Sequence, residues 1–288
     1  MPLLRTLLSQ AWAATLICCA CAPWMGAVAG PDINTPRPIA AVDSVFMEEL
    51  TWVEVRDALR AGKTTAIVAT GGVEQNGPYL VTGKHNYVLR ATTEAIARKL
   101  GNALVAPIVA FVPEGNIDPA SGHMRYPGTI SVRPQTFERL LTDIAESLRV
   151  HGFRHIILIG DSGGNQQGMA QVARSLNVKW RERGPHIYFV PQYYREWTNP
   201  QGPQRLLAAQ GIHQTPEGLH DDFIVSAVLM SVDPQLVRMR QRMQAGKFSI
   251  NGVSLAPPEK SIALGRQLVD HVADVTVTAI RKAIALDK

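Results

Sequence analysis

The chain has 288 residues, 46% of them hydrophobic and 18% charged, and its formal net charge is +5. This composition supplies enough apolar material for the core of one large domain and excludes a chain that is disordered throughout. The basic residues form no dense run, so the charge excess predicts no nucleic-acid partner.

The first 29 residues have the organisation of a secretory signal peptide. Arg5 precedes an apolar run over 11–22, and Ala27-Val28-Ala29 has the small residues of a cleavage site. Cleavage there predicts a periplasmic or secreted protein that starts near Gly30. An uncleaved N-terminal anchor is the alternative. A lipoprotein is disfavoured because no cysteine follows a small-residue lipobox.

The cysteines limit the chemistry of the mature chain. All three, at positions 18, 19 and 21, precede the predicted cleavage site. The mature protein is therefore expected to have no disulfide, no thiol nucleophile and no cysteine metal site. No later apolar run reaches the roughly 18 residues of a membrane span, so no membrane association is expected after cleavage.

Residues 30–42 form a Pro-rich lead-in, and strands and helices alternate over 43–288. Strands are predicted at 65–70, 104–112, 155–159 and 187–191. Helices are predicted at 48–60, 86–100, 134–151, 166–180, 222–231 and 257–285. This alternation, without hairpin signals, predicts a single α/β domain with a mostly parallel sheet and helices on both faces.

Sites in such folds lie at the carboxyl ends of strands, which points to the loops 71–86, 113–129 and 160–165. The first holds Glu74, Asn76 and His85, a carboxylate and an imidazole suited to metal binding or acid–base chemistry. A polar surface turn is the alternative.

The second of these loops, 113–129, contains Glu114, Asp118 and His123. Long ordered loops in compact domains often bind ligands, which makes His123 a candidate substrate-binding residue. A hydrogen-bonded structural histidine is the alternative.

The third loop reads GDSGGN over 160–165. GDSGG also surrounds the nucleophile of chymotrypsin-like proteases, but those are disulfide-linked double β-barrels. The G-x-S-x-G pattern between a strand and a helix fits a nucleophile elbow, with Ser162 as the nucleophile. The alternative is a glycine turn whose backbone amides face a ligand at a helix N-terminus.

A further polar group precedes the helix predicted at 222–231. His220, Asp221 and Asp222 are consecutive. They could cap the helix, since Asp is favoured at that position. Alternatively, His220 transfers a proton while one aspartate orients it or binds a metal.

Taken together, four segments resemble the motifs of the creatininase family of metal hydrolases. They read GGVEQNGPYLVTGKH, HMRYPGTISVRPQTF, HGFRHIILIGDSGGN and HDDFIVSAVLMSVDPQLV. The resemblance runs from about residue 47 to residue 282. It implies a single α/β domain, a hydrolase that self-associates, and a small-molecule substrate such as a cyclic amide, lactam, lactone or related carbonyl compound.

The same resemblance implies a two-metal site of zinc or manganese, but most ligand positions differ. Glu74 is retained, whereas Asn76, His85, Ser162 and Phe223 stand at the other four positions. Amide, hydroxyl and phenyl groups are poor substitutes for imidazole and carboxylate ligands. His123 and His220 match a loop histidine and a catalytic-region histidine of the family.

We therefore expect one divalent ion, zinc or manganese, on Glu74, His85 and Asp161, provided that Asp161 points toward the other two. Catalytic roles are expected for His220 in proton transfer, for Asp222 or its neighbour Asp221 in steering it, and for Ser162 in hydrogen bonding. Substrate binding is expected of Asn76, His123 and Asn165.

Two alternatives remain open. A metal-free serine hydrolase would use Ser162 as nucleophile, His220 or His85 as base, and the amides of Gly163 and Gly164 for the oxyanion. A periplasmic ligand-binding pseudoenzyme would keep the pocket without catalysis.

Overall fold

The computed structural model describes residue 30, residues 32–181 and residues 184–286. The predicted signal peptide lies outside the described residues. The chain divides into a short N-terminal unit, residues 1–36, and a main unit, residues 37–288. In the N-terminal unit, a turn is closed by the backbone N–H of Thr35, which donates to the carbonyl of Asp32 at 2.9 Å. The elements below belong to the main unit.

The core of the main unit is a four-stranded sheet. Its strands are β1 (Thr65–Thr70), β2 (Ala103–Val105), β3 (His155–Gly160) and β4 (His186–Phe189), in the order β2-β1-β3-β4. All neighbours are parallel, and Thr70 at the end of β1 pairs with Gly160 at the end of β3. The parallel sheet predicted from the sequence is confirmed.

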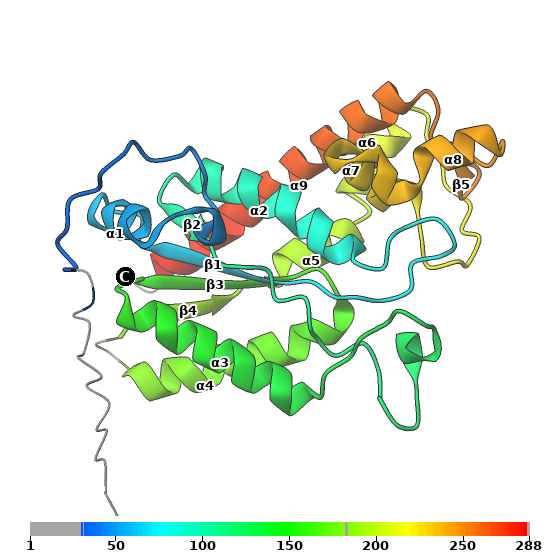
Figure 1. Ribbon diagram of the computed structural model, residues 1–288. Coiled ribbons are helices and arrows are strands. Elements are labelled where there is room, and N and C mark those ends of the chain that lie inside the picture. The colour runs from blue at the N-terminus through cyan, green and yellow to red at the C-terminus, as the bar shows by residue number, and fades with distance from the viewer. Residues whose placement is uncertain (1–29, 31, 182–183, 287–288) are drawn as a thin grey trace, which may run out of the picture. The chain divides into compact units, whose positions relative to one another are not determined.

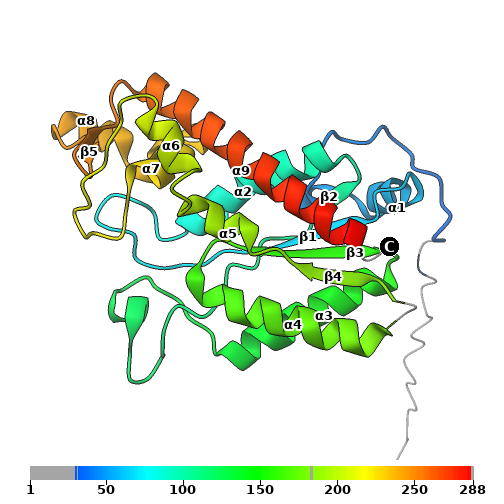
Figure 2. The ribbon, with the colours of Figure 1, turned by 180° about the vertical axis from the view of Figure 1, so that it is seen from behind.

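Helices cover both faces of the sheet (Figures 1 and 2). The α-helices are α1 (Trp52–Arg60), α2 (Lys84–Leu100), α3 (Pro134–Val150), α4 (Gln166–Trp180), α5 (Gln192–Trp197), α6 (Pro203–Ala208), α7 (Phe223–Val232), α8 (Met239–Gln244) and α9 (Pro258–Leu286). Short 3-10 helices lie at Met47–Glu49, Gly122–Arg125, Gly163–Asn165 and Pro234–Val237.

Alternate residues of the central strands face opposite layers, as extended chain requires. Ile67 and Ile157 pack on the side of α2 and α9, while Ala66 and Ile156 pack on the side of α3 and α4. A third apolar cluster joins α7 to the first half of α9, away from the sheet. It lies where α6, α7 and α8 gather in Figure 1.

Several predicted boundaries are wrong for identifiable reasons. The strand predicted at 104–112 ends at Val105, because Pro107 has no N–H for the sheet, and only isolated bridges continue at Val109 and Val112. The helix predicted at 48–60 is interrupted, because Thr51 caps a new helix: its side chain accepts from the N–H of Glu54.

The predicted absence of hairpins is also wrong. Strands β5 (Ser249–Ile250) and β6 (Val253–Ser254) form an antiparallel hairpin. Asn251 and Gly252 connect them with φ of 49° and 75°. Positive φ at both positions is what a type I′ turn needs, and Asn-Gly is its usual sequence. That signal was therefore present in the sequence.

Among the described residues, no helix is long and apolar enough to cross a membrane.

Candidate active site

Three loops meet beyond the paired ends of β1 and β3. The N–H of Asp161 donates to the carbonyl of Thr70 at 3.0 Å. Gly164 lies against the 113 loop so closely that a Cβ there would be 2.4 Å from the carbonyl oxygen of Pro113. The predicted proximity of the 71–86 and 160–165 loops is thus confirmed, and the 113–129 loop joins them.

Asn165 holds this junction together. Its buried Nδ2 donates to the carbonyls of Thr70 and Gly71, at 3.1 and 2.9 Å, and approaches Thr70 Oγ1 at 3.0 Å. The amide nitrogen is therefore used in tying the loops together, and the expected role of Asn165 in substrate binding gains no support from its contacts.

Helix α2 positions the His85 side chain where the three loops meet. The sequence-based boundary placed His85 in a loop, but the helix starts at Lys84, so His85 lies in its first turn. Asn86 fixes that turn to the end of β1, since its side chain accepts from the N–H of Gly72 at 3.2 Å and donates to the carbonyl of Gly72 at 3.1 Å.

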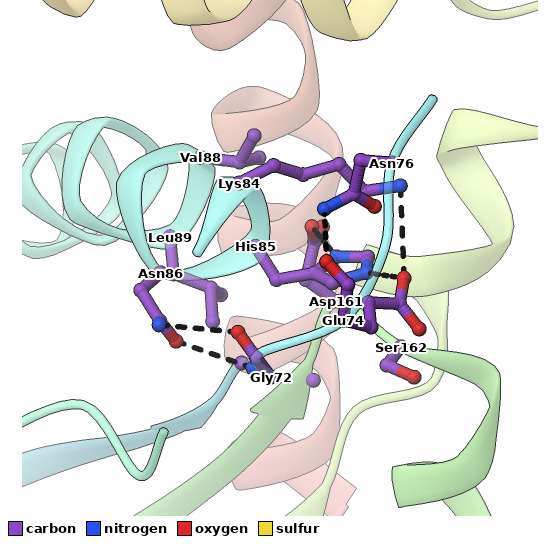
Figure 3. Close-up of polar contacts among 12 residues, drawn as sticks. Gly72, Glu74, Asn76, Lys84, His85, Asn86, Val88, Leu89, Asp161 and Ser162 are labelled. Carbon is purple, nitrogen blue, oxygen red and sulfur yellow. Dashed lines mark hydrogen bonds and ion pairs between the residues drawn. The ribbon is translucent and has the colours of Figure 1, made fainter. Parts of the chain in front are cut away.

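His85 lies between two carboxylates (Figure 3). Its Nε2 is 2.7 Å from Glu74 Oε1, and its Nδ1 is 2.7 Å from Asp161 Oδ2. Burial alone would lower the pKa of His85, but the hydrogen bonds to Asp161 and Glu74 outweigh burial and raise it to about 9. His85 is thus an imidazolium that donates from both nitrogens.

This arrangement changes the interpretation of the predicted metal set. Glu74, His85 and Asp161 do lie together, and Asp161 points inward. However, His85 has no ring nitrogen left for a metal while both hydrogen bonds stand. The other oxygen of Asp161 accepts from the hydroxyl of Tyr193 at 3.1 Å, which fixes the carboxylate further.

Lys84 adds a second cation to the cluster. Its Nζ is 3.7 Å from Glu74 Oε1, and its side chain is buried. Figure 3 shows the Lys84 side chain running past His85 from the same helix end. Two cations therefore face the two carboxylates Glu74 and Asp161, so the chain itself balances their charge.

A second group of possible ligands surrounds the same glutamate. His123 Nε2 is 3.3 Å from Glu74 Oε2, and His220 Nε2 is 3.8 Å from Glu74 Oε1. The two imidazole rings lie 4.3 Å apart between centroids. One ligand atom from each of the three residues can be chosen so that all lie within 4.8 Å of one another.

The tautomer of His220 is set by the chain. Its Nδ1 lies 2.8 Å from the backbone carbonyl of Gln75, which can only accept, so Nδ1 carries the proton and Nε2 faces Glu74 with its lone pair. Burial and the charge of Lys84 lower the pKa of His220. His220 also has φ of +61°, a conformation that is uncommon for a residue with a Cβ.

Glu114 completes the cluster, although sequence reasoning had noted it without assigning it a role. Burial and the neighbouring charge of Glu74 raise the pKa of Glu114. A Cβ on Gly72 would lie 2.0 Å from Glu114 Oε1, so glycine at position 72 makes room for this carboxyl. Glu114 is therefore a protonated acid at neutral pH, next to an ionised one.

The remaining predicted residues divide between cavity and scaffold. Ser162 lines a cavity of about 370 Å³ together with Glu74, Glu114, His123 and His220. In the described part of the chain, no imidazole is hydrogen-bonded to the Ser162 hydroxyl. Position 223, one of the implied ligand positions, is a core phenylalanine that is 2% exposed.

Two predicted side chains make backbone contacts. Asn76 Nδ2 donates to the carbonyls of Glu74, Val81 and Thr82, at 2.9 to 3.3 Å. Asp222 Oδ1 accepts from the N–H of Val225 at 2.7 Å, so Asp222 caps α7, which is the capping alternative drawn from the sequence.

Sequence reasoning missed Tyr194, which lines the cavity from α5. Its signal was its position just after the carboxyl end of a strand, where sites of such folds lie.

Comparisons with known proteins place this geometry in a family. The family model of creatinine amidohydrolase, creatininase, matches residues 48–280. The creatinine amidohydrolase of Pseudomonas putida is 27% identical over 139 residues, 48% of this chain and 52% of that protein. The mycofactocin precursor peptide peptidase of Mycolicibacterium smegmatis is 28% identical over 123 residues, 41% and 47% of the two chains. The chain spans about half the length of these curated relatives.

Solved structures agree on the fold. A creatinine amidohydrolase (creatininase) crystal structure has a TM-score of 0.56 and 22% identity, covering 85% of this chain and 98% of that one. A mutant creatininase of the Zn–Zn type has a TM-score of 0.57 and 21% identity, covering 85% and 99%. A manganese creatininase has a TM-score of 0.56 and 21% identity, covering 85% and 98%. With the family model matching most of its length, the chain belongs to the creatininase family.

Proposed function

We propose that the protein is a hydrolase that cleaves a C–N amide bond of a small molecule with the help of one divalent metal ion. The observation that carries this proposal is the convergence of Glu74, His123 and His220, whose ligand atoms lie within 4.8 Å of one another. Two imidazoles and one carboxylate are the ligand set of several catalytic zinc sites, which keep a position open for water or substrate.

The residues present do not fit the two-metal arrangement of the family. His85 is hydrogen-bonded to carboxylates through both ring nitrogens. The amide nitrogen of Asn76 donates to backbone carbonyls, and Phe223 is a core residue. They do fit one ion. His220 presents a free Nε2, and Glu74 Oε2 faces His123 while Oε1 stays with His85.

A zinc or manganese ion bound there would supply Lewis acidity toward water and the substrate carbonyl. Hydrolysis adds water to the carbonyl carbon, breaks the C–N bond and gives a proton to the leaving nitrogen. Glu114 lies in the same cavity beside Glu74, so its carboxyl is placed to give that proton.

Other groups of the cavity suit the carbonyl oxygen. The Ser162 hydroxyl and the backbone at Gly163 and Gly164 line the same cavity. Hydrogen-bond donors that face a developing oxyanion lower the barrier to acyl transfer. We assign Ser162 this role and not that of nucleophile, because no base is hydrogen-bonded to it among the described residues.

The relatives support the choice of an amide as the substrate class. One is named for hydrolysis of creatinine, a cyclic amide, and the other for peptidase action on a precursor peptide. Both names denote cleavage of a C–N bond. We extend that bond type, and no individual substrate, to this protein.

A ligand-binding protein without catalysis is the second candidate. The observation in its favour is that Lys84 and His85 already neutralise Glu74 and Asp161, so the carboxylates do not need a metal.

Metal content separates the candidates. Wild-type protein dialysed against zinc or manganese should retain about one ion per chain and hydrolyse at least one compound of a panel of cyclic and linear amides that includes creatinine. His123→Ala and His220→Ala should lose both properties. His213→Ala, which removes an exposed histidine, should keep both.

Two results would contradict the proposal. Amide hydrolysis by metal-free wild-type protein would remove the metal from the mechanism, and labelling of Ser162 by a fluorophosphonate would then establish the serine alternative. Absence of hydrolysis of every amide in the panel, with or without bound metal, would favour the ligand-binding protein.

A further inference from the structure

A second cavity adjoins the cluster of ionisable groups. Its volume is about 310 Å³. It shares four lining residues with the cavity around Glu74, namely His85, Asp161, Tyr194 and His220. The two cavities are therefore neighbouring chambers of one site. We call the second one the apolar chamber.

Three helices wall the apolar chamber. Val88 comes from α2, Trp197 from α5, and Ile224, Val225 and Val228 from α7. Val88, Ile224 and Val228 are at most 3% exposed, so these side chains are firmly packed around the chamber. Figure 3 shows Val88 one turn along α2 from Lys84, above His85.

Most polar groups in this chamber already have partners. Lys84 lies 3.7 Å from Glu74, and Asp222 caps α7. Asp221 differs: its Oδ1 is buried and has no hydrogen-bond partner within the described part of the chain. A buried carboxylate oxygen without a partner is costly, and a ligand N–H would satisfy it.

We infer that the apolar chamber takes a branched aliphatic or aryl substituent of the substrate, so that the site selects amides with one apolar side group. This inference rests on the proposed function and adds the class of substrate. Small-molecule sites combine apolar walls with a few polar groups that fix the orientation of the ligand. Here His220 and Asp161 are such polar groups, and they line both cavities. The amide would lie in the cavity around Glu74, and the substituent would extend past His220 into the apolar chamber.

The test compares two amides that differ only in their alkyl group, acetamide and isovaleramide. Dissociation constants are measured by ligand-observed NMR with the wild-type protein, both after dialysis against zinc and after treatment with a chelator. Burial of each additional methylene improves binding about fourfold, so the three extra carbons of isovaleramide should tighten binding roughly fifty-fold.

Two variants of α7 locate the effect. Val225→Phe fills the chamber from a half-buried position and should reduce the ratio of the two dissociation constants to near one. Val232→Phe adds the same group at a 40% exposed position of the same helix and should keep the ratio. Circular dichroism and zinc content show whether each variant is folded.

Equal dissociation constants for the two amides in the wild type would overturn the inference. So would an unchanged ratio in folded Val225→Phe. Failure of the proposed function can be told apart from failure of this inference. The proposed function is tested by zinc content and amide hydrolysis, whereas the inference is tested by the ratio of the two dissociation constants. A fifty-fold ratio in a protein that binds no zinc and hydrolyses no amide would keep the apolar chamber and remove the hydrolase.

Discussion

The Nδ1–H of His220 donates a hydrogen bond to the backbone carbonyl oxygen of Gln75, with 2.8 Å between the two heavy atoms. The contact joins two segments 145 residues apart. It fixes the tautomer of His220 without using any side chain of Gln75, so substitutions at position 75 cannot remove it directly.

The Gln75 side chain itself supports the other imidazole. Its Nε2 lies 3.5 Å from His123 Nδ1, and its Oε1 accepts from the N–H of Gly77 at 3.1 Å. An amide nitrogen can only donate, so this contact leaves His123 Nδ1 as the acceptor and places the ring proton on Nε2, the nitrogen that faces Glu74. That proton must leave before a metal binds at Nε2, so we predict that Gln75→Ala strengthens zinc binding. Competition with a chelator of known affinity measures the change. Gln210→Ala, at an exposed position, serves as the control, and equal affinities of both variants would contradict the prediction.

Removal of the imidazolium between the two carboxylates should be costly. In His85→Leu, Glu74 and Asp161 lose the partner that each contacts at 2.7 Å. Breaking a buried charged pair by removal of one partner costs about 3–5 kcal/mol, because the remaining charge stays buried and unpaired. We expect that loss in the free energy of unfolding, measured by urea denaturation at pH 7 in the presence of a chelator.

The double variant isolates the cause of this loss. Asp161→Asn removes one of the two carboxylate charges and should restore part of the stability of His85→Leu. If the double variant were less stable than His85→Leu alone, lost packing and not unpaired charge would explain the result.

Helix α9 packs on α7 at a glycine. A Cβ on Gly265 would lie 2.0 Å from the carbonyl oxygen of Ala227. Alanine favours a helix over glycine by about 1 kcal/mol, but here the neighbour is backbone and cannot turn away. We therefore predict that Gly265→Ala lowers the free energy of unfolding by about 1–3 kcal/mol, the usual cost of overpacking.

Gly168→Ala is the matched control. Its added Cβ would be 2.8 Å from Phe137 Cδ1, a longer approach than the 2.0 Å at Gly265, and to a side chain instead of backbone. It should therefore destabilise less than Gly265→Ala, and the opposite order in urea denaturation would refute this explanation.

The start of α1 should make stability depend on pH. Glu54 accepts from the N–H of Thr51 at 2.7 Å and from the N–H of Val42 at 2.9 Å, and the hydrogen bonds from Thr51 lower its pKa. Its folded pKa is thus below its unfolded value. The stabilisation is present above the unfolded pKa and is lost as the pH falls through the folded pKa.

Glu54→Gln should consequently be less stable than the wild type at pH 7, and the difference should shrink between pH 5 and pH 3. Urea denaturation at several pH values measures it. Glu259→Gln, at an exposed position in the first turn of α9, should show a smaller difference. A Glu54→Gln difference that grows on acidification has the wrong sign for this mechanism.

Export can be tested directly. Arg5, the apolar run over 11–22 and the alanines at 27 and 29 predict cleavage near Gly30. The intact mass of protein recovered from the periplasm or medium of a producing bacterium should correspond to a chain that starts at or near Gly30. A full-length product confined to the cytoplasm would contradict the prediction.

The sheet was predictable because its strands are short apolar runs bounded by turn residues. That pattern, together with the intervening helices, is sufficient to predict the strands Thr65–Thr70 and His155–Gly160. Pro107 should have shortened the second strand, and Asn251-Gly252 should have indicated the hairpin, because both carry defined backbone preferences.

The sequence predicted which loops form the site, but not which side chains contact one another within it. The strand ends indicated that Glu74, His85 and Asp161 would meet. The sequence could not show that both nitrogens of His85 would be used, because that depends on side-chain directions in segments 76 residues apart. Nor could it bring Glu74, His123 and His220 together, since His123 and His220 lie in two loops whose paths no sequence periodicity predicts.

The internal balance of charge around Glu74 bears on how the protein matures. Lys84 and His85 match Glu74 and Asp161 before any ion arrives, so the polypeptide does not depend on zinc to hold these carboxylates together. Folding and metal acquisition are then separable events. On the proposed function, a chain that folds where metal is scarce would keep a receptive site, and a chelator would remove its activity while leaving its fold in place.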